Sequence, residues 1–266
     1  MAVARLDLAQ RELAQGVKLK GQLTDAYSMR VIADCEAMVD AIENWKITSV
    51  RFDERFEGET AKSIGGGWIE ADNVNGISIT REYTKEKGGR AKFAGMQVGR
   101  DWSTTSLARD IPGQGFHSLE ITLQPGKVDK AEYGVSIYYA QQGENWTGFH
   151  VGFAAGGKVR YQPHGSDRDM DGRDMNVGWM DVRIPLPDPK EIILRLSLGE
   201  KARATNLTLS FWNAAKGEWV AAQKDIPVNL GAGRGNWRVA AWTRAWKGQE
   251  VLLHVDNFRV FERARR

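Results

Sequence analysis

The chain has 266 residues, 42% of them hydrophobic, which is enough to bury a sizeable core in one large domain or two small ones. Lys and Arg total 37 and Asp and Glu total 34, so the net charge is only +3, which by itself gives no sign of a nucleic-acid-binding protein. Cys35 is the one cysteine, which excludes an intrachain disulfide and fits folding in a reducing compartment.

The first 48 residues are expected to form a short α-helical arm. One helix is predicted over residues 3–15, with Gly16 as its C-terminal cap. A second is predicted over residues 25–45, where apolar side chains recur four and three residues apart, at Val31, Cys35, Met38, Ile42 and Trp45. This stripe fits a helix that packs on its own domain and also a helix that self-associates. The second alternative predicts contacts with other assembly subunits and a homo-oligomer.

Residues 1–30 carry charged side chains among their apolar positions, at Arg5, Asp7, Arg11 and Glu12. This pattern lacks the apolar core of a signal peptide and the length of a membrane span. We therefore expect the chain to be made in the cytoplasm, without membrane insertion. A virion or particle surface is a final location that fits this expectation.

From residue 47 onward glycine becomes frequent, and apolar residues alternate with polar ones as in half-buried strands. Strands are predicted at residues 50–56, 77–81, 91–98, 116–123, 133–139, 148–154, 158–162, 177–184, 191–198, 205–212, 218–222, 237–241 and 251–261. Turn-forming pairs such as Pro112-Gly113 and Lys247-Gly248 lie between them. Because crossover helices are missing from this pattern, it predicts an all-β, antiparallel two-sheet sandwich over residues 49–266 and excludes a parallel α/β fold.

Three segments carry a family resemblance: FDERFEG at positions 52–58, Gly67-Trp68, and VDNFRVF at positions 255–261. Together they resemble the concanavalin A-like lectin/glucanase (laminin-G-like) jelly-roll superfamily, over about residues 50–262. The resemblance implies two curved sheets whose first and last strands pair. It also implies ligands on the concave face or at the rim loops. The predicted helical arm lies outside it.

A run of carboxylates forms the most specific local pattern, at Asp167, Asp169, Asp171 and Asp174. The first three, with Gly172 after them, match the first half of an oxygen-ligand calcium loop. Gly178 stands where an EF-hand loop has its bidentate glutamate, so Asp174 or Asp181 supplies the missing ligand in this interpretation. A calcium site and a solvated loop of mixed charge remain as alternatives.

Strand alternation predicts one face that is both polar and aromatic. If Ile137 faces the core, Tyr138 faces the other way, and the same alternation brings His150 and Arg160 to that side, with Trp146 at its edge. Rings that stack on sugar C–H faces, beside groups that hydrogen-bond to hydroxyls, are what a glycan-binding surface needs. The predicted ligand-binding residues are therefore Tyr138, Trp146, His150 and Arg160. An ordinary half-exposed sheet face is the alternative.

Most tryptophans keep strand alternation or flank turns, and we expect them to pack in the core: Trp68, Trp179, Trp212, Trp219 and Trp237. Trp242 and Trp246 fall near the predicted turn at Lys247-Gly248. These two are therefore the better candidates for exposed tryptophans.

Candidate catalytic residues are few. The glucanase branch of the superfamily uses a Glu-x-Asp-x-x-Glu run on one strand, and this sequence lacks such a run. Glu82 and Glu86 fall in a Lys-rich region that is expected to be a solvated loop. The histidines do not have metal-ligand spacing, at His117, His150, His164 and His254. We therefore expect that the protein is not an enzyme.

These observations favour a structural or adhesive component of a larger assembly, such as a phage particle, that displays a lectin-like sandwich. A stand-alone carbohydrate-binding module is the main alternative, and a glycan-cleaving enzyme is the third. Glycan and other assembly subunits are the expected partners, and nucleic acid is not. Calcium is the one cofactor that the sequence suggests.

Overall fold

The computed structural model describes residues 48–71, 76–99, 102–113, 115–126, 131–139, 148–154, 157–164, 179–182, 185–199, 206–227 and 236–263. Throughout these ranges the regular secondary structure is β-strand, which confirms the all-β prediction. The predicted helical arm lies outside the described residues. Within them, no helix has the length and apolar character needed to span a membrane.

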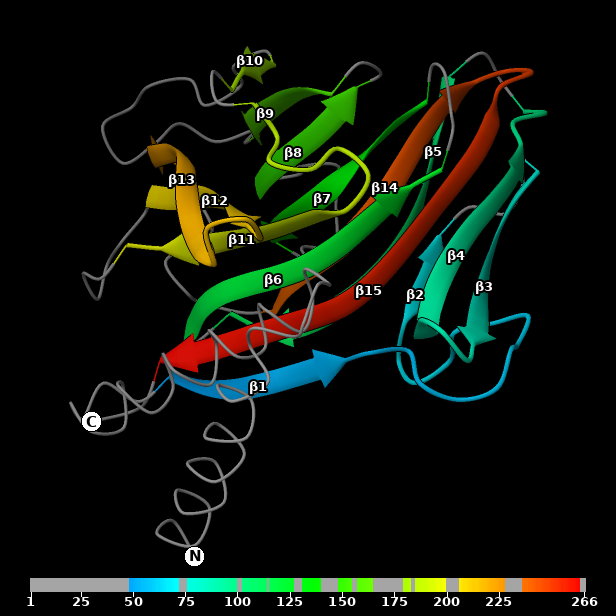
Figure 1. Ribbon diagram of the computed structural model, residues 1–266, viewed down its shortest axis with the longest axis horizontal. Coiled ribbons are helices and arrows are strands. Elements are labelled where there is room, and N and C mark those ends of the chain that lie inside the picture. The colour runs from blue at the N-terminus through cyan, green and yellow to red at the C-terminus, as the bar shows by residue number, and fades with distance from the viewer. Residues whose placement is uncertain are drawn as a thin grey trace, which may run out of the picture.

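Eight strands form one antiparallel sheet, here called sheet A. Seven of them follow the order β13-β12-β11-β6-β15-β4-β3, and β1 pairs with β15 beside β4. Their bounds are β1 (Thr48–Glu54), β3 (Ile77–Thr84), β4 (Gly88–Met96), β6 (Phe116–Pro125), β11 (Ile192–Leu198), β12 (Asn206–Asn213), β13 (Glu218–Pro227) and β15 (Glu250–Arg263). The long, curved strands β6 and β15 run through the middle of this sheet (Figure 1).

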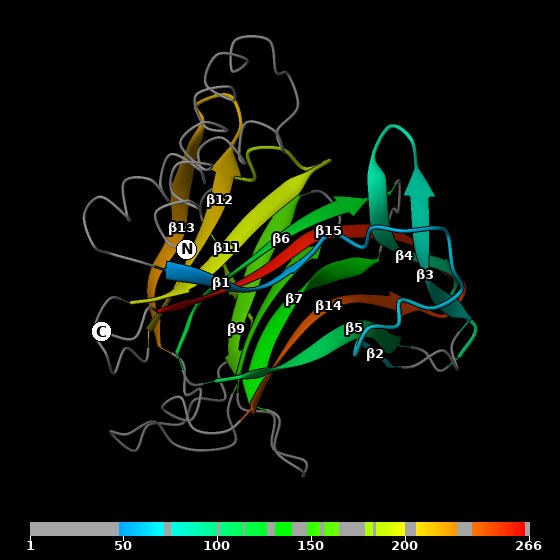
Figure 2. The same cartoon turned by 90° about the horizontal axis from the view of Figure 1, so that it is seen from below.

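Seven strands form the second antiparallel sheet, sheet B, in the order β10-β9-β8-β7-β14-β5-β2. Their bounds are β2 (Ile69–Ala71), β5 (Trp102–Pro112), β7 (Glu132–Tyr139), β8 (Gly148–Ala154), β9 (Lys158–His164), β10 (Met180–Asp181) and β14 (Asn236–Trp246). Figure 2 shows the two sheets as layers of a sandwich. The two-sheet antiparallel prediction is therefore confirmed.

The core lies between the sheets because each strand turns alternate apolar side chains inward. Aromatic rings from opposite sheets meet there. Phe153 of β8 lies edge-on to Phe211 of β12 at 6.1 Å between ring centres, and Phe116 of β6 lies 5.1 Å from Trp237 of β14. All four side chains are at most 3% exposed. Residues of β8 and β14 that face away from sheet A are consequently left to form a separate surface.

The first and last strands pair, as the family resemblance implied. β1 lies antiparallel to the second half of β15, with Val50 opposite Phe261 and Glu54 opposite Phe258. Strand β15 has a β-bulge after Asp256, where Asn257 adopts a positive φ of 50°. The Asn257 backbone N–H donates to Oδ1 of Asp256 at 2.6 Å, which stabilises this turn of the chain locally.

The structure also contains strands that the sequence pattern missed. Strand β5 is eleven residues long, but its sequence does not alternate between apolar and polar residues. The reason is that polar Thr105 and charged Arg109 are among the residues that face the core. Arg109 places its guanidinium 4.1 Å from the centre of the Phe52 ring, a cation–π contact. Of the strand predicted over residues 177–184, the structure describes residues 179–182, and within these Met180–Asp181 form β10.

Candidate functional site

The surface of sheet B that faces away from sheet A, here called the outer face, carries the side chains left over by core packing. In β7, Val135 and Ile137 are fully buried in the core, so Ser136 and Tyr138 project to the outer face. In β8, Phe149 and Val151 point inward by the same alternation, and His150 points outward. The structure thus places Tyr138 and His150 together on the face that strand alternation predicted.

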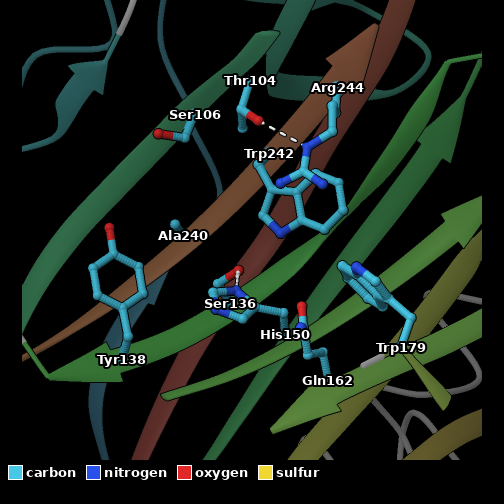
Figure 3. A pocket seen from close by; sticks show the side chains of 10 residues that line it. All are labelled: Thr104, Ser106, Ser136, Tyr138, His150, Gln162, Trp179, Ala240, Trp242 and Arg244. Carbon is cyan, nitrogen blue, oxygen red and sulfur yellow. Dashed lines mark hydrogen bonds between the residues drawn. The ribbon is translucent and has the colours of Figure 1, made fainter. Parts of the chain in front are cut away.

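A cavity of about 470 Å³ opens on the outer face (Figure 3). Among the described residues it is lined by side chains of β5, β7, β8, β9 and β14 and by the residue before β10: Thr104, Ser106, Ser136, Tyr138, His150, Gln162, Trp179, Ala240, Trp242 and Arg244. Three aromatic rings therefore surround a small set of hydroxyl, amide, imidazole and guanidinium groups. Cavities of this size and lining are typical of small-molecule sites.

Two glycines make room for Trp242 within this cavity. In the ladder Gly134 of β7 stands opposite both Trp242 and Gly152 of β8. A Cβ atom at Gly134 would lie 2.4 Å from Cζ2 of Trp242, closer than carbon atoms can approach. The indole can therefore lie across these two strands, where its ring centre is 6.4 Å from that of Trp179. The result is a continuous aromatic wall.

A serine and a histidine form the polar floor of the cavity. Ser136 and His150 are directly opposite each other in the ladder, and Oγ of Ser136 is 2.6 Å from Nδ1 of His150. The Tyr138 ring lies beside the imidazole, 6.4 Å away between centres. Burial raises the pKa of Tyr138, and the nearby Arg238 opposes this effect. The phenol is therefore neutral at pH 7, with a hydroxyl that can both donate and accept.

Arginines and carboxylates flank the cavity. Arg244 donates from Nε to Oγ1 of Thr104 at 3.0 Å. Arg160 forms an ion pair with Glu132 and lies 5.5 Å over the Trp179 ring, so it supports the wall without lining the cavity itself. Burial lowers the pKa of Arg244, and the nearby Arg160 adds to this effect while Glu132 opposes it.

The other predicted site residues lie outside the described residues: Trp146, Asp167, Asp169, Asp171 and Asp174. The glycan-contacting role of Trp146 and the calcium loop both stay predictions. Within the described part of the chain, no group of three or more His, Cys, Asp or Glu side chains could hold a metal ion.

The cavity also corrects two sequence-based expectations. Trp242 was expected to be exposed near a turn, but it lies within β14, which reaches Trp246, and is only 5% exposed. Trp179 was expected in the core, but it lines the cavity. The contributions of β5, Thr104 and Ser106, were missed with the strand. Gly134 and Gly152 are visible in the sequence, but their position opposite Trp242 follows only from the strand order.

Two further carboxylates of the outer face, Asp110 and Glu132, are held by arginines. Asp110 accepts from Nε and Nη2 of Arg238 at 2.5 and 2.9 Å, and Glu132 pairs with Arg160. Asp110 is opposite Arg238 in the ladder, whereas Glu132 is opposite Arg244, six residues along β14, which corresponds to about 20 Å. They are thus too far apart to act together on one glycosidic bond, which requires a separation of roughly 5–10 Å.

No family model matches the sequence, and neither does any curated protein. Solved structures do match in fold. They include a GlcNAcα1-4Gal-releasing endo-β-galactosidase from Clostridium perfringens (TM-score 0.55, 9% identity, 82% of this chain). They also include a laminarinase from Flavobacterium sp. UMI-01 (TM-score 0.52, 9% identity, 80% of this chain). A third is the CBM2 module of the evolved Dit of Lactobacillus casei BL23 phage J-1 (TM-score 0.53, 10% identity, 83% of this chain). This chain spans 63% of the endo-β-galactosidase, 100% of the laminarinase and 98% of the CBM2 module.

These matches show that the protein has the concanavalin A-like sandwich fold that the sequence resembled. They also contradict the expectation that the protein is not an enzyme, because two of the three proteins are enzymes by name. The lack of a Glu-x-Asp-x-x-Glu run was therefore not a sufficient reason for that conclusion.

Proposed function

We propose that the protein recognises a glycan in the cavity on the outer face of sheet B. The observation that carries this proposal is the aromatic wall of Trp179 and Trp242 beside the hydrogen-bonding pair of Ser136 and His150. Sugar rings present apolar C–H faces that stack on aromatic rings, and hydroxyls that exchange hydrogen bonds with polar side chains. A cavity of about 470 Å³ holds one or two sugar rings with part of the chain outside.

The fold comparison supports a glycan as the ligand class. A laminarinase and an endo-β-galactosidase share this sandwich, and so does a module named CBM2. Because a shared fold does not fix function, the cavity carries the proposal and the likeness only supports it. Sandwiches of this fold thus occur in proteins whose names describe action on glycans.

Substitution of Trp179 by Ala tests the proposal, since this tryptophan forms one side of the wall and is not fully buried. The full-length chain is screened by isothermal titration calorimetry against a panel of neutral and acidic oligosaccharides. Loss of one stacking ring is expected to weaken binding by about tenfold, or ~1.4 kcal/mol. Each probe is also assayed for newly released reducing ends, because release would extend the proposal from binding to cleavage.

Trp246→Ala provides the matched control. Trp246 is also a tryptophan of sheet B, is 50% exposed and does not line the cavity. The control is expected to bind as the native protein does. Equal loss of affinity in both variants, or no binding of any probe by the native protein, would overturn the proposed site.

A second role concerns where the sandwich is displayed. We propose that residues 1–48 attach it to a larger assembly such as a phage particle. The likeness to a module of a phage protein supports this proposal. Light scattering of the full chain and of a chain that begins at Ser49 tests the oligomeric part. A defined oligomer that becomes monomeric on shortening is expected, and two monomers would contradict self-association through this segment.

A further inference from the structure

The side of sheet A that faces away from sheet B is buried over much of its middle, although it is not the core side. In β6, Leu119, Ile121 and Leu123 belong to the core, so the residues between them point to this far side. A group of far-side residues on β6 and its neighbours, here called the sheet A patch, is nevertheless at most 8% exposed: Ser118, Glu120, Thr122, Ile193, Trp212 and Phe261. Sheet B does not cover the patch, since it lies on the other side of sheet A (Figure 2).

Neighbouring side chains on the same sheet do not account for this burial. Ser118 stands between Ser197 of β11 and Phe261 of β15 in the ladder, and it is 3% exposed. Ala94 holds the same kind of position in β4, between a leucine and a serine, and it is only half-buried. A further layer therefore covers the sheet A patch. In the described part of the chain every strand belongs to one of the two sheets, which leaves this layer to residues outside the described ranges.

The charged side chains in and beside the patch are paired, as burial requires. One ladder row across β11, β6, β15 and β1 alternates in charge, at Arg195, Glu120, Arg259 and Asp53. Arg195 forms an ion pair with Glu120, and Nε of Arg259 donates to Oδ1 of Asp53 at 3.2 Å. Charged side chains lose their hydration when they are covered, and they are almost never fully buried unless paired. The row thus allows a second layer to lie over this side of the sheet.

The segment that precedes β1 is well placed to supply this layer. Strand β1 begins at Thr48, and its Val50 stands opposite Phe261 of the patch. Two residues separate Thr48 from the predicted helix over residues 25–45, so this helix must end close to the border of the patch. A helix over these residues would be about 30 Å long. The four neighbouring strands from β12 to β15 span roughly 15 Å between their axes, so the helix is long enough to cross them.

We propose that the predicted helix over residues 25–45 packs on the sheet A patch of its own chain, with its apolar stripe against Ile193, Trp212 and Phe261. The stripe needs an apolar surface, since its side chains recur on one side of the predicted helix: Val31, Cys35, Met38, Ile42 and Trp45. The three patch residues provide such a surface outside the core. This inference is independent of the glycan cavity on the outer face of sheet B, and it leaves residues 1–24 for the attachment role.

Cys35 makes the proposal testable, because it is the one cysteine of the chain and belongs to the stripe. The rate at which the full-length chain reacts with a maleimide is measured in buffer and in urea. Because the sheet covers it, Cys35 is expected to react about a hundredfold more slowly in the folded than in the unfolded chain. Equal rates in buffer and in urea would overturn the proposal.

Ile193→Asp is expected to raise the labelling rate in buffer about tenfold, since it places a charge beneath the stripe. Met96→Asp is the matched control, because Met96 is also an apolar residue of sheet A but is 47% exposed and outside the patch. This control is expected to keep the native rate. The milder Ile193→Ala is expected to raise the rate about threefold, and it keeps the test valid if the aspartate variant does not fold. An unchanged rate in the Ile193 variants would overturn packing on this patch.

Dilution distinguishes packing within one chain from packing between two copies. Packing within one chain predicts a labelling rate that does not depend on protein concentration. A rate that rises on dilution would show that a second copy covers the patch, and would overturn the proposal. Because the oligosaccharide assays do not involve Cys35, failure of this proposal leaves the proposed glycan recognition intact, and the reverse also holds.

Discussion

Ser136 and His150 face each other directly across the β7–β8 ladder, with 2.6 Å between Oγ and Nδ1. The contact fixes the orientation of the imidazole at the floor of the cavity. In the same ladder row, His150 stands opposite Gln162 of β9, so three neighbouring strands supply one polar strip. The strip runs beside the Trp242 ring, and a ligand that stacks on the ring can reach its polar groups.

Ser136→Ala is expected to weaken glycan binding by about three- to tenfold, or roughly 0.5–1.5 kcal/mol, because the imidazole loses the contact between its Nδ1 and the serine hydroxyl. Calorimetry with the best-binding oligosaccharide measures the change. Ser78→Ala serves as control, since it removes a serine hydroxyl that donates to the carbonyl of Ala94 at 3.1 Å on sheet A. Unchanged affinity in the Ser136 variant would contradict a role for this pair in binding.

The two glycines under the aromatic wall are expected to differ in their tolerance of a methyl group. At Gly134 a Cβ atom would lie 2.1 Å from the carbonyl oxygen of Val151, so backbone must move, whereas at Gly152 its nearest neighbours are indole carbons at 3.2 Å. We expect Gly134→Ala to destabilise the fold by about 1–3 kcal/mol and Gly152→Ala by less. Urea unfolding of both variants provides the comparison. A larger loss at Gly152 would show that the indoles, and not the backbone, limit the space.

Much of the sandwich could be predicted from the sequence because its core strands alternate strictly. The runs at 133–139 and 148–154 have Val, Ile and Phe at alternate positions, and all of these side chains are 0% exposed in the structure. The face that carries Tyr138 and His150 follows from the same alternation. Such local patterns need no knowledge of how the strands are ordered.

The composition of the cavity could not be predicted, because it depends on strand order. Strand β14 lies between β7 and β5, which brings Trp242 next to residues more than a hundred positions earlier, including Gly134 and Ser106. No local pattern encodes that neighbourhood. Strand β5 was missed altogether because polar residues occupy part of its inward face. Trp242 was wrongly expected to be exposed near the turn, because β14 continues to Trp246, almost to Gly248.

Because Arg195 and Glu120 form an ion pair on sheet A, we expect substitution of Arg195 to lower the free energy of unfolding strongly. The Glu120 side chain is fully buried, Nε of Arg195 donates to its Oε1 at 2.6 Å, and the guanidinium lies 4.0 Å over the Trp219 ring. Arg195→Leu leaves a buried carboxylate without this partner and is expected to cost about 3 kcal/mol of unfolding free energy. Denaturant unfolding at neutral pH measures it.

The double variant Glu120→Leu with Arg195→Leu serves as the control for this pair. Because both charges are then absent, the double variant is expected to be more stable than Arg195→Leu alone. A double variant that loses the sum of the two single effects would show that the two side chains do not interact energetically. In that case the contact with Trp219 would account for the loss.

His254 makes the stability of sheet A sensitive to pH. Its Nε2 lies 3.1 Å from Oε2 of Glu82. The Glu82 carboxylate accepts hydrogen bonds from Arg90 at Oε2 and from Lys92 at Oε1. Glu82 is therefore part of a strand-borne ion-pair network, and not of the solvated loop that the sequence suggested. Burial opposes ionisation of Glu82, but the hydrogen bonds from Lys92 and Arg90 outweigh it and lower its pKa to about 2. Burial and the nearby Arg90 lower the pKa of His254 to about 4, against the opposing effect of Glu82.

Between pH 6.5 and pH 4 the unfolded chain therefore binds a proton at His254 that the folded protein does not, so the free energy of unfolding falls as the pH falls through this window. The loss is on the order of 3 kcal/mol when complete. The contribution of Glu82 is lost separately, as the pH falls from 4.5 to about 2. Urea unfolding of His254→Gln between pH 7 and pH 5 is expected to show a shallower pH dependence than the native protein. Identical slopes for the native protein and His254→Gln would refute the assignment, because the titrating group would then be another residue.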